Sequence, residues 1–284
     1  MSESAAILLE AEAAFGRGET PVLATVVATR GSSYRKAGAR MLVSDHRWRA
    51  GSISGGCLES DVVRRGDWLV QHGQPVLRTY DTSSDGDVAL GCGGEVDVVL
   101  EPLRPDSPTV RALRRVVQDR APAEVKVGDF TQQLTPSARL VLIGGGYDVA
   151  PVVALAHSLG WDVHVVDWRP SPRTDARFHL LSPHQLERLP LEAGCAVVVM
   201  SHHLLYDEAA VLAALGSALP GYVGLLGPRK RTEEVLARRP AGLSLERLRT
   251  PVGLDLGGEG AAAVALAIVA ELQLHFSGKA RDDM

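Results

Sequence analysis

Short apolar runs and polar segments follow one another along the first 130 residues without a regular order. The β-branched run at residues 22–29 predicts a strand, and the apolar run at 41–44 predicts its neighbour. Residues 57–70 have apolar side chains on roughly one helical face, which predicts a helix. Further elements are predicted as strands at 77–80, 96–100 and 125–127 and as a helix at 110–118. Strands and helices that do not alternate regularly are typical of an α+β domain, which we assign to residues 1–130.

The pattern changes after the polar, proline-containing stretch at residues 131–138, where we place the domain boundary. Beyond it, buried apolar runs that predict strands alternate with segments that predict helices. The strands are "RLVLIGGG", "VHVVDWR", "CAVVVMS" and "YVGLLG", and the helices span residues 150–159 and 207–215. This rhythm is typical of a parallel, doubly wound sheet. We therefore expect an α/β protein in which a Rossmann-like domain, residues 138–284, follows the α+β domain.

Composition and charge narrow the class of protein. A chain of 284 residues with 45% hydrophobic content is long enough for two domains with their own cores. A net charge of -4 argues against a surface built mainly for nucleic acid. The N-terminus is acidic where a signal peptide needs a basic start, and the most apolar run, residues 261–270, is shorter than the roughly 20 residues of a membrane span. Three widely spaced cysteines make no disulfide framework, so we expect a soluble, cytoplasmic protein without nucleic acid or membrane as partner.

The stretch "GSISGGCLESD", residues 51–61, places glycines and serines directly before Cys57 and a predicted helix. Small residues allow the backbone to approach a ligand closely and leave N–H groups to point at it. A helix N-terminus stabilises negative charge, including a thiolate. This stretch therefore predicts an anion-binding cradle with an accessible thiol.

Two of the three cysteines lie beside paired glycines. Cys57 follows Gly55 and Gly56, and Cys92 lies in "GCGGE". Two thiols that face one cleft can bind a ligand, transfer sulfur or form a redox pair. Cys195 lies inside a predicted strand and is interpreted as a small buried apolar residue. Cys57 and Cys92 are therefore the candidate reactive residues.

The loop "RGSSYRKAGAR", residues 30–40, gathers four cations around glycine and serine. Arginine forks, hydroxyl groups and backbone amides are groups that bind phosphate. Taken alone, a basic hairpin connection is more simply a solvated turn. Its presence in the same domain as the two cysteine motifs favours Gly31, Ser32 and Arg35 as ligand contacts.

In the second domain, "VLIGGGYDVA" and "VVDWR" match the pattern of a nucleotide-binding turn. Gly144 and Gly146 follow a strand and open a helix, where a pyrophosphate can reach the helix N-terminus. Asp167 ends the next strand, where a carboxylate can bind a ribose 2′-OH. Val149 stands at the third glycine position, and Asp148, also a candidate contact, has a charge that opposes phosphate. NAD(P), another nucleotide and no nucleotide at all stay open as alternatives.

The motif "MSHHLLYDE" follows a predicted strand at the edge where doubly wound sheets bind ligands. Adjacent side chains point in different directions, so His202 and His203 are poor joint metal ligands. The sequence has no other spacing typical of a metal site, and we expect none. His202, His203 or Asp207 is a candidate proton carrier or ligand contact in the crevice.

Together these motifs resemble the XdhC/CoxI family, the accessory factors of xanthine dehydrogenase and related molybdenum hydroxylases. The resemblance covers nearly the whole chain and rests on seven motifs in the family's order. Three lie in the first domain: "ATVVATRGSSYRKAGARMLV", "GSISGGCLESDV" and "ALGCGGEVDVVLEP". Four lie in the second: "GGGYDVAPVVALAHSLGWDVHVVDWRP", "VVMSHHLLYDEAAV", "YVGLLGPRKR" and "PVGLDLGGEGAAAVALAIVAEL". Two features depart from the family's pattern: Tyr34 stands where many relatives have proline, and "GGEGAA" lacks the usual acidic helix start.

The resemblance implies a maturation chaperone rather than an enzyme with ordinary turnover. Such proteins bind molybdenum cofactor (molybdopterin), protect it while a cysteine desulfurase supplies its terminal sulfido ligand, and hand it to the apo-subunit of the hydroxylase. Molybdopterin carries a phosphate and a metal-bound dithiolene, which suit backbone donors with a nearby thiol. By matching position, the resemblance gives Gly55, Gly56, Cys57, Glu59 and Cys92 as cofactor contacts. It also implies self-association, as a dimer.

Two alternatives stand beside the chaperone. The first is an NAD(P)-dependent oxidoreductase that uses Gly144, Gly146 and Asp167, with His202 or His203 as acid or base. The second is a nucleotide-sensing module, which would tolerate the loss of both Cys57 and Cys92.

Overall fold

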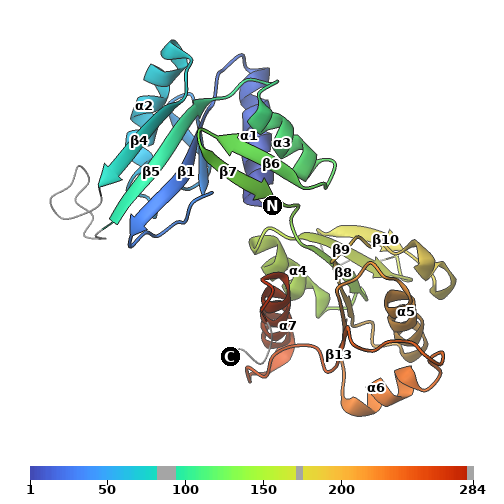
Figure 1. Ribbon diagram of the computed structural model, residues 1–284. Coiled ribbons are helices and arrows are strands. Elements are labelled where there is room, and N and C mark those ends of the chain that lie inside the picture. Colours follow the sequence, from blue (N-terminus) through green and yellow to red (C-terminus); the bar gives the residue numbers. More distant parts are fainter. Residues whose placement is uncertain (82–93, 171–174, 280–284) are drawn as a thin grey trace. The chain divides into compact units, whose positions relative to one another are not determined.

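The computed structural model describes residues 1–81, 94–170 and 175–279, without the side chains of residues 67–72 in helix α2 (Glu59–His72) (Figure 1). The chain divides into two compact units, one spanning residues 2–136 and one beginning at residue 137. The first unit holds an antiparallel sheet with helices, and the second holds a parallel sheet with helices. This arrangement confirms the predicted α/β class, with an α+β domain followed by a Rossmann-like domain.

The first unit is built on a five-stranded antiparallel sheet in the order β3-β2-β1-β5-β4. Its strands are β1 (Val22–Gly31), β2 (Arg40–Ser44), β3 (Arg47–Gly51), β4 (Val76–Asp81) and β5 (Gly94–Pro102). Helix α2 covers one face (Figure 1). The other face is covered by α1 (Glu3–Gly16), α3 (Pro108–Val117) and the hairpin of β6 (Ala123–Val127) and β7 (Phe130–Leu134). Because both faces are covered, β1 and β2 carry apolar side chains at successive positions: Leu23 packs on the α1 side and Ala24 on the α2 side.

Loops of the first unit meet at one edge of the sheet because neighbouring strands run in opposite directions. Gly31, at the end of β1, pairs with Gly94 at the start of β5. Met41 in β2 pairs with Gly51 at the end of β3. The segments 31–39 and 51–58 therefore lie at the same edge, and we call these two segments together with Gly94 the loop edge.

Strand β7 lies just before the division between the two units, in residues for which the sequence pattern predicted no strand. The strand buries Leu134 fully and Phe130 only in part, and the positions between them are polar. A strand of this kind lacks the apolar alternation by which strands are identified in a sequence. It is held by antiparallel pairing with β6, whose alternation is clear.

The second unit is built on a six-stranded sheet that is parallel throughout, in the order β10-β9-β8-β11-β12-β13. Its strands are β8 (Arg139–Ile143), β9 (Asp162–Asp167), β10 (Arg177–Leu180), β11 (Ala196–Val199), β12 (Tyr222–Leu225) and β13 (Leu248–Arg249). This is the strand order of dinucleotide-binding Rossmann domains. From β8 the chain adds β9 and β10 on one side, and it then returns to add β11, β12 and β13 on the other side, so the strand order reverses between β8 and β11. Ligands of such sheets bind beside the carboxyl ends of the strands at that point.

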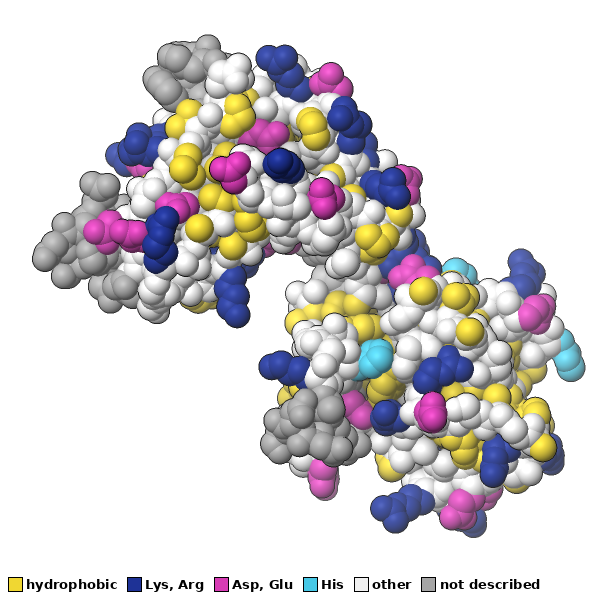
Figure 2. All heavy atoms as spheres, in the orientation of Figure 1, with side chains coloured by type: hydrophobic (Ala, Val, Ile, Leu, Met, Phe, Trp, Pro, Cys, Tyr) yellow, Lys and Arg dark blue, Asp and Glu magenta, His cyan; other side chains and the backbone are white. Residues whose placement is uncertain are grey.

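Helices α4 (Val149–Ser158) and α7 (Gly260–Phe276) cover one face of this sheet (Figure 1). Helices α5 (Leu204–Gly216) and α6 (Arg229–Leu236) cover the other face with the 3₁₀ helix η1 (Pro183–Arg188). Within the described residues, no helix is long and apolar enough to cross a membrane. On the face shown in Figure 2, cationic and anionic side chains are interspersed, and the described residues there form no continuous basic patch.

Candidate functional site

The segment that precedes α2 is shaped by the buried carboxylate of Glu59. Its Oε1 accepts hydrogen bonds from the backbone N–H groups of Ile53 (3.1 Å) and Ser54 (2.8 Å) and from the hydroxyl of Ser52 (2.9 Å). Its Oε2 accepts the hydroxyl of Ser54. Burial alone would raise the pKa of the Glu59 carboxyl, but the hydrogen bonds from Ser54 and Ser52 outweigh it and lower the pKa. With four bonds accepted and 2% of its surface exposed, Glu59 organises the loop. Glu59 therefore has a structural role, and its contact with a ligand stays a prediction.

The N–H groups at the start of α2 converge on a single point, as expected for a cradle, but a protein oxygen occupies that point. The hydroxyl oxygen of Ser54 accepts from the N–H groups of Gly56 (3.2 Å), Cys57 (3.0 Å) and Leu58 (3.1 Å). These donors were expected to be available to an anion, and in the structure Ser54 satisfies them. An anionic ligand at this point has to displace the Ser54 hydroxyl. The signal in the sequence was a serine three residues before Cys57, at helix-cap spacing.

The thiol of Cys57 lies at the surface of the loop edge. Cys57 is exposed and forms no disulfide with another described cysteine. Gly56 beside it has a φ of 111°, a conformation that favours glycine. Gly55 lies under the ring of Tyr34, since a Cβ added there would come within 3.8 Å of that ring. Tyr34 is 80% exposed, so an aromatic side chain from the first loop lies beside the segment that carries the thiol.

Two of the four cations of the basic loop are paired with carboxylates. Arg30 binds Glu95 (2.8 Å) and Asp97 (2.7 Å) on β5. Arg35 binds Glu3 at 2.5 Å, so its guanidinium is directed toward α1. The structure therefore gives no support to Arg35 as a phosphate contact.

Gly31 and Ser32 lie against the start of β5. Gly31 has a φ of 73°. A Cβ on Gly94 would come within 2.3 Å of the carbonyl oxygen of Ser32, so only glycine fits between these strands. The structure thus brings Gly31 and Ser32 to the same edge as residues 51–58. Cys92, the second candidate thiol, lies outside the described residues.

We expect Glu59→Gln to destabilise the first unit by about 2 kcal/mol, because the amide turns one acceptor into a donor that faces other donors. The pKa of the carboxyl is lowered below its ordinary value of 4.5, so its stabilisation is complete above that pH and is lost as the pH falls through the lowered value. Urea denaturation should show a large difference between wild type and variant at pH 7 that shrinks as the pH falls through the lowered pKa. Glu124→Gln, which removes an exposed carboxylate from β6, is the control. Equal, pH-independent losses in both variants would contradict this role of Glu59.

The glycine turn of the second unit joins β8 to α4 at the reversal of strand order. Gly144 has a φ of 126°, and a Cβ there would lie 2.7 Å from the carbonyl oxygen of Met200. Its N–H donates to the carbonyl of Val166 at 2.8 Å. Glycine is therefore required at position 144 because the segments after two neighbouring strands come into close contact. This packing explains Gly144 without any bound ligand.

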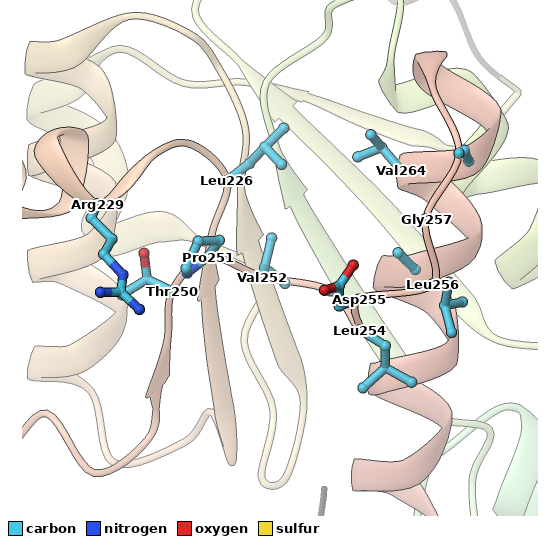
Figure 3. Close-up of a pocket in the computed structure, with 14 residues that line it drawn as sticks. Leu226, Arg229, Thr250, Pro251, Val252, Leu254, Asp255, Leu256, Gly257 and Val264 are labelled. Atoms are coloured by element: carbon cyan, nitrogen blue, oxygen red, sulfur yellow. The ribbon is translucent and has the colours of Figure 1, made fainter.

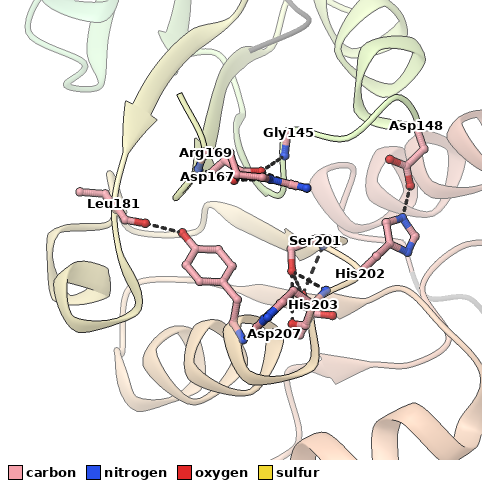
Figure 4. Close-up of polar contacts among 10 residues, drawn as sticks. Gly145, Asp148, Asp167, Arg169, Leu181, Ser201, His202, His203 and Asp207 are labelled. Atoms are coloured by element: carbon pink, nitrogen blue, oxygen red, sulfur yellow. Dashed lines mark hydrogen bonds and ion pairs between the residues drawn. The ribbon is translucent and has the colours of Figure 1, made fainter. Parts of the chain in front are cut away.

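The carboxylate of Asp167 is already bound by the protein. It accepts from the N–H of Gly145 and from the N–H (2.8 Å), Nε (3.0 Å) and Nη2 (2.8 Å) of Arg169 (Figure 4). Burial alone would raise its pKa, but the hydrogen bonds from Arg169 and Gly145 outweigh it and lower the pKa. Arg169 also stacks on Trp168, with its guanidinium carbon 4.5 Å from the ring centroid. A ribose could bind Asp167 only after Arg169 moved away. Sequence reasoning gave no role to this arginine, which ends the motif "VVDWR" two residues after Asp167.

Asp148 and His202 are hydrogen-bonded across the point where the strand order reverses. His202 Nε2 lies 2.6 Å from Asp148 Oδ2, and it joins the segment after β11 to the N-terminus of α4 (Figure 4). A Cβ on Gly146 would lie 2.8 Å from Asp148 Oδ1, so the carboxylate sits against the glycine turn. A carboxylate therefore occupies the position at this helix N-terminus where a nucleotide pyrophosphate would bind.

The neighbouring histidine, His203, points elsewhere. Its Nδ1 accepts from the N–H of Tyr206 at 3.4 Å and caps α5. Its ring packs on Trp168 with a centroid distance of 5.1 Å. His202 and His203 therefore have separate partners, as the difference in their directions predicted.

Asp207 is buried and paired, so the expectation that it faces the crevice as a proton carrier was wrong. Its Oδ2 accepts from Arg231 Nε at 3.0 Å and from the same guanidinium a second time. Its Oδ1 accepts from the N–H (3.2 Å) and the hydroxyl of Ser201. Asp207 therefore ties the segment after β11 to helix α6.

The strand order, the glycine turn and the preceding antiparallel unit define the class of protein: a Rossmann-type domain joined to an α+β domain that exposes a thiol. Two family models match the sequence: "XdhC and CoxI family" at residues 14–81 and "XdhC Rossmann domain" at residues 140–272. The chain belongs to the XdhC and CoxI family.

Two curated relatives match along most of their length. The chain is 30% identical to a probable xanthine dehydrogenase subunit from Bacillus subtilis, over 89% of this chain and 92% of that protein. It is 27% identical to the molybdenum cofactor insertion chaperone PaoD of Escherichia coli, over 94% of this chain and 86% of that protein. A crystal structure described as a xanthine dehydrogenase from Bacillus halodurans has 27% identity and a TM-score of 0.80, covering 100% of this chain and 98% of that one.

Proposed function

We propose that this protein binds molybdenum cofactor and inserts it into a molybdenum hydroxylase of the xanthine dehydrogenase type. The relative PaoD is named a molybdenum cofactor insertion chaperone, and the Bacillus subtilis relative is named a probable xanthine dehydrogenase subunit. Both match nearly the whole chain, which supports a shared role for the two domains together.

The observation that carries this proposal is the exposed thiol of Cys57 on a loop that buried groups hold in place. Glu59 and Ser54 fix the backbone around it through the hydrogen bonds described for the loop edge. Thiolate is a soft ligand suited to transition metals and to sulfur transfer. A thiol that is exposed yet positioned can contact the cofactor's metal end without a change of fold.

The proposal has three more specific parts. The chain holds the cofactor while a cysteine desulfurase supplies the terminal sulfido ligand, and it then hands the cofactor to the apo-subunit. Cys92 acts as a second thiol beside Cys57. The chain works as a dimer in the cytoplasm.

The proposal is tested by activation of a purified apo-hydroxylase. We expect cofactor supplied on this protein to restore xanthine oxidation several-fold more effectively than the same amount of free cofactor. Adding cysteine desulfurase with cysteine should raise the yield further if sulfuration occurs on this chain. Equal activation with and without the protein would contradict the proposal.

NAD(P) binding in the second unit is the second candidate, favoured by the strand order and the glycine turn. Asp148 at that turn opposes a pyrophosphate, because like charges a few ångströms apart repel strongly away from water. We expect weak NADPH binding by the wild type and about tenfold tighter binding by Asp148→Asn, measured by fluorescence titration. Glu233→Gln, which removes an exposed carboxylate from α6, should change nothing. Tight wild-type binding that Asp148→Asn leaves unaltered would contradict this role of Asp148.

A further inference from the structure

A pocket of about 560 Å³ lies at the carboxyl ends of β12 and β13, between residues 250–258 and helix α7 (Figure 3). Small-molecule sites commonly have volumes of about 300 to 1,000 Å³. The pocket shares no lining residue with the Asp148–His202 pair. It is therefore distinct from the place where a Rossmann domain holds a pyrophosphate.

Apolar and polar groups line the pocket in about equal measure. Its aliphatic side chains include Leu226, Val252, Leu254, Leu256, Val264 and Ala267. Aliphatic side chains suit the face of a flat ring, which loses contact with water when it binds, and the polar groups suit substituents on the ring edge. The lining therefore fits a planar heterocycle that carries polar groups.

The segment that forms one wall is fixed by backbone hydrogen bonds. The N–H of Gly253 donates to the buried Glu271 carboxylate at 2.5 Å. The N–H groups of Val252 and Leu254 donate to the carbonyls of Leu225 (3.1 Å) and Ala267 (3.2 Å). The pocket is thus held in shape before any ligand binds.

One end of the pocket presents a hydrogen-bond acceptor beside donors. Asp255 is exposed and forms no ion pair with any described residue. Gly257 and Gly258 have φ values of 71° and 87°, and in the described part of the chain their N–H groups donate to no acceptor. Two carboxylate oxygens next to backbone N–H groups match a ring edge that carries a carbonyl, a ring N–H and an amino group in a row.

The opposite end presents a cation. In Figure 3, Arg229 lies beside Thr250 and Pro251, at the other end of the segment 250–255 from Asp255. Arg229 stands at the start of α6, is exposed and forms no ion pair among the described residues. A guanidinium at a helix N-terminus is a favourable partner for a phosphate group.

We propose that this pocket binds a phosphorylated pteridine or purine ring through its amino-lactam edge. Asp255 accepts from the ring N–H and the adjacent amino group, the glycine N–H groups donate to the ring carbonyl, and Arg229 pairs with the phosphate. The pteridine of molybdenum cofactor and the base of a guanine nucleotide share this chemistry. The pteridine arm of the proposal rests on the proposed function, and the guanine arm does not.

The test is isothermal titration calorimetry of the full chain with neopterin phosphate, GMP and AMP. We expect neopterin phosphate or GMP to bind, and AMP, which lacks the amino-lactam edge, to bind at least about tenfold more weakly. Tighter binding of neopterin phosphate identifies a pteridine site, and tighter binding of GMP identifies a guanine nucleotide site. Asp255→Asn should weaken both by about tenfold, and Arg229→Gln should weaken them but not unphosphorylated neopterin or guanosine.

Matched controls come from the neighbouring positions. Lys230→Gln and Glu259→Gln remove the same charges from exposed residues that do not line the pocket, and binding should be unchanged. Failure of both neopterin phosphate and GMP to bind, or equal binding of AMP, would overturn the proposed role of the pocket. Binding by Asp255→Asn with the wild-type affinity would also overturn it. If these ligands do not bind but molybdenum cofactor still binds in a way that depends on Cys57, the proposed function stands and the pocket proposal fails. If the pocket binds its ligands but the protein does not bind molybdenum cofactor, the proposed function fails and the pocket proposal stands.

Discussion

Replacing Cys57 with alanine is expected to reduce activation of the client hydroxylase by at least about tenfold, or about 1.4 kcal/mol of cofactor binding. The side chain is exposed, so its loss removes a ligand atom without opening a cavity. The hydrogen bond from the backbone N–H of this residue to Ser54 does not involve the side chain and should remain. Surface substitutions of this kind change the free energy of unfolding by about 0.5 kcal/mol or less, so the loss should be functional.

The control for this variant is the buried thiol of Cys195. Cys195→Ala removes a sulfur from the core of the second unit and should lower stability slightly while leaving activation intact. Cys57→Ser, which keeps the size of the side chain, should behave like Cys57→Ala because the hydroxyl is a poor soft-metal ligand. Full activation by Cys57→Ala would remove the thiol from the mechanism.

Of all the substitutions described, Arg231→Gln, which removes the guanidinium, should lower the free energy of unfolding most. Asp207 is fully buried, and Arg231→Gln leaves its carboxylate without its cation. Breaking a buried ion pair from one side costs about 3 to 5 kcal/mol, because the remaining charge stays out of water. Urea denaturation of the second unit should report a loss of about 3 kcal/mol, near the lower end, since Arg231 is partly exposed.

Two further variants separate this effect from a general loss of charge. Arg238→Gln breaks the contact of an exposed arginine with Glu208 at 3.6 Å and should cost at most about 1 kcal/mol. Asp207→Asn combined with Arg231→Gln should cost less than the sum of the two single variants, because no unpaired charge remains. Similar losses in Arg231→Gln and Arg238→Gln would show that the buried pair has no special role.

The sequence predicts the elements whose apolar positions follow a clear period. Residues 139–143 and 196–199 are buried on both faces of a parallel sheet, so their continuous apolar runs identify them. Strands β7 and β10 have polar or partly exposed side chains and give no such signal. The two-residue strand β13 is too short to show any period.

The candidate sites show the same limit at the level of single residues. The motifs located the glycine turn and the loop that carries Cys57, because glycine and cysteine are informative in themselves. They did not show that Arg169 binds Asp167 or that His202 binds Asp148, since those partners depend on how chain segments meet in space. Sequence reasoning treated each acidic side chain as available, and the fold shows which of them the protein itself uses.

The most direct test of the central claim is anaerobic equilibrium binding of isolated molybdenum cofactor to the purified protein, with wild type and Cys57→Ala side by side. The account predicts saturable binding by the wild type and binding at least about tenfold weaker by the variant. No binding by the wild type, under conditions in which a known carrier protein binds the cofactor, would contradict it.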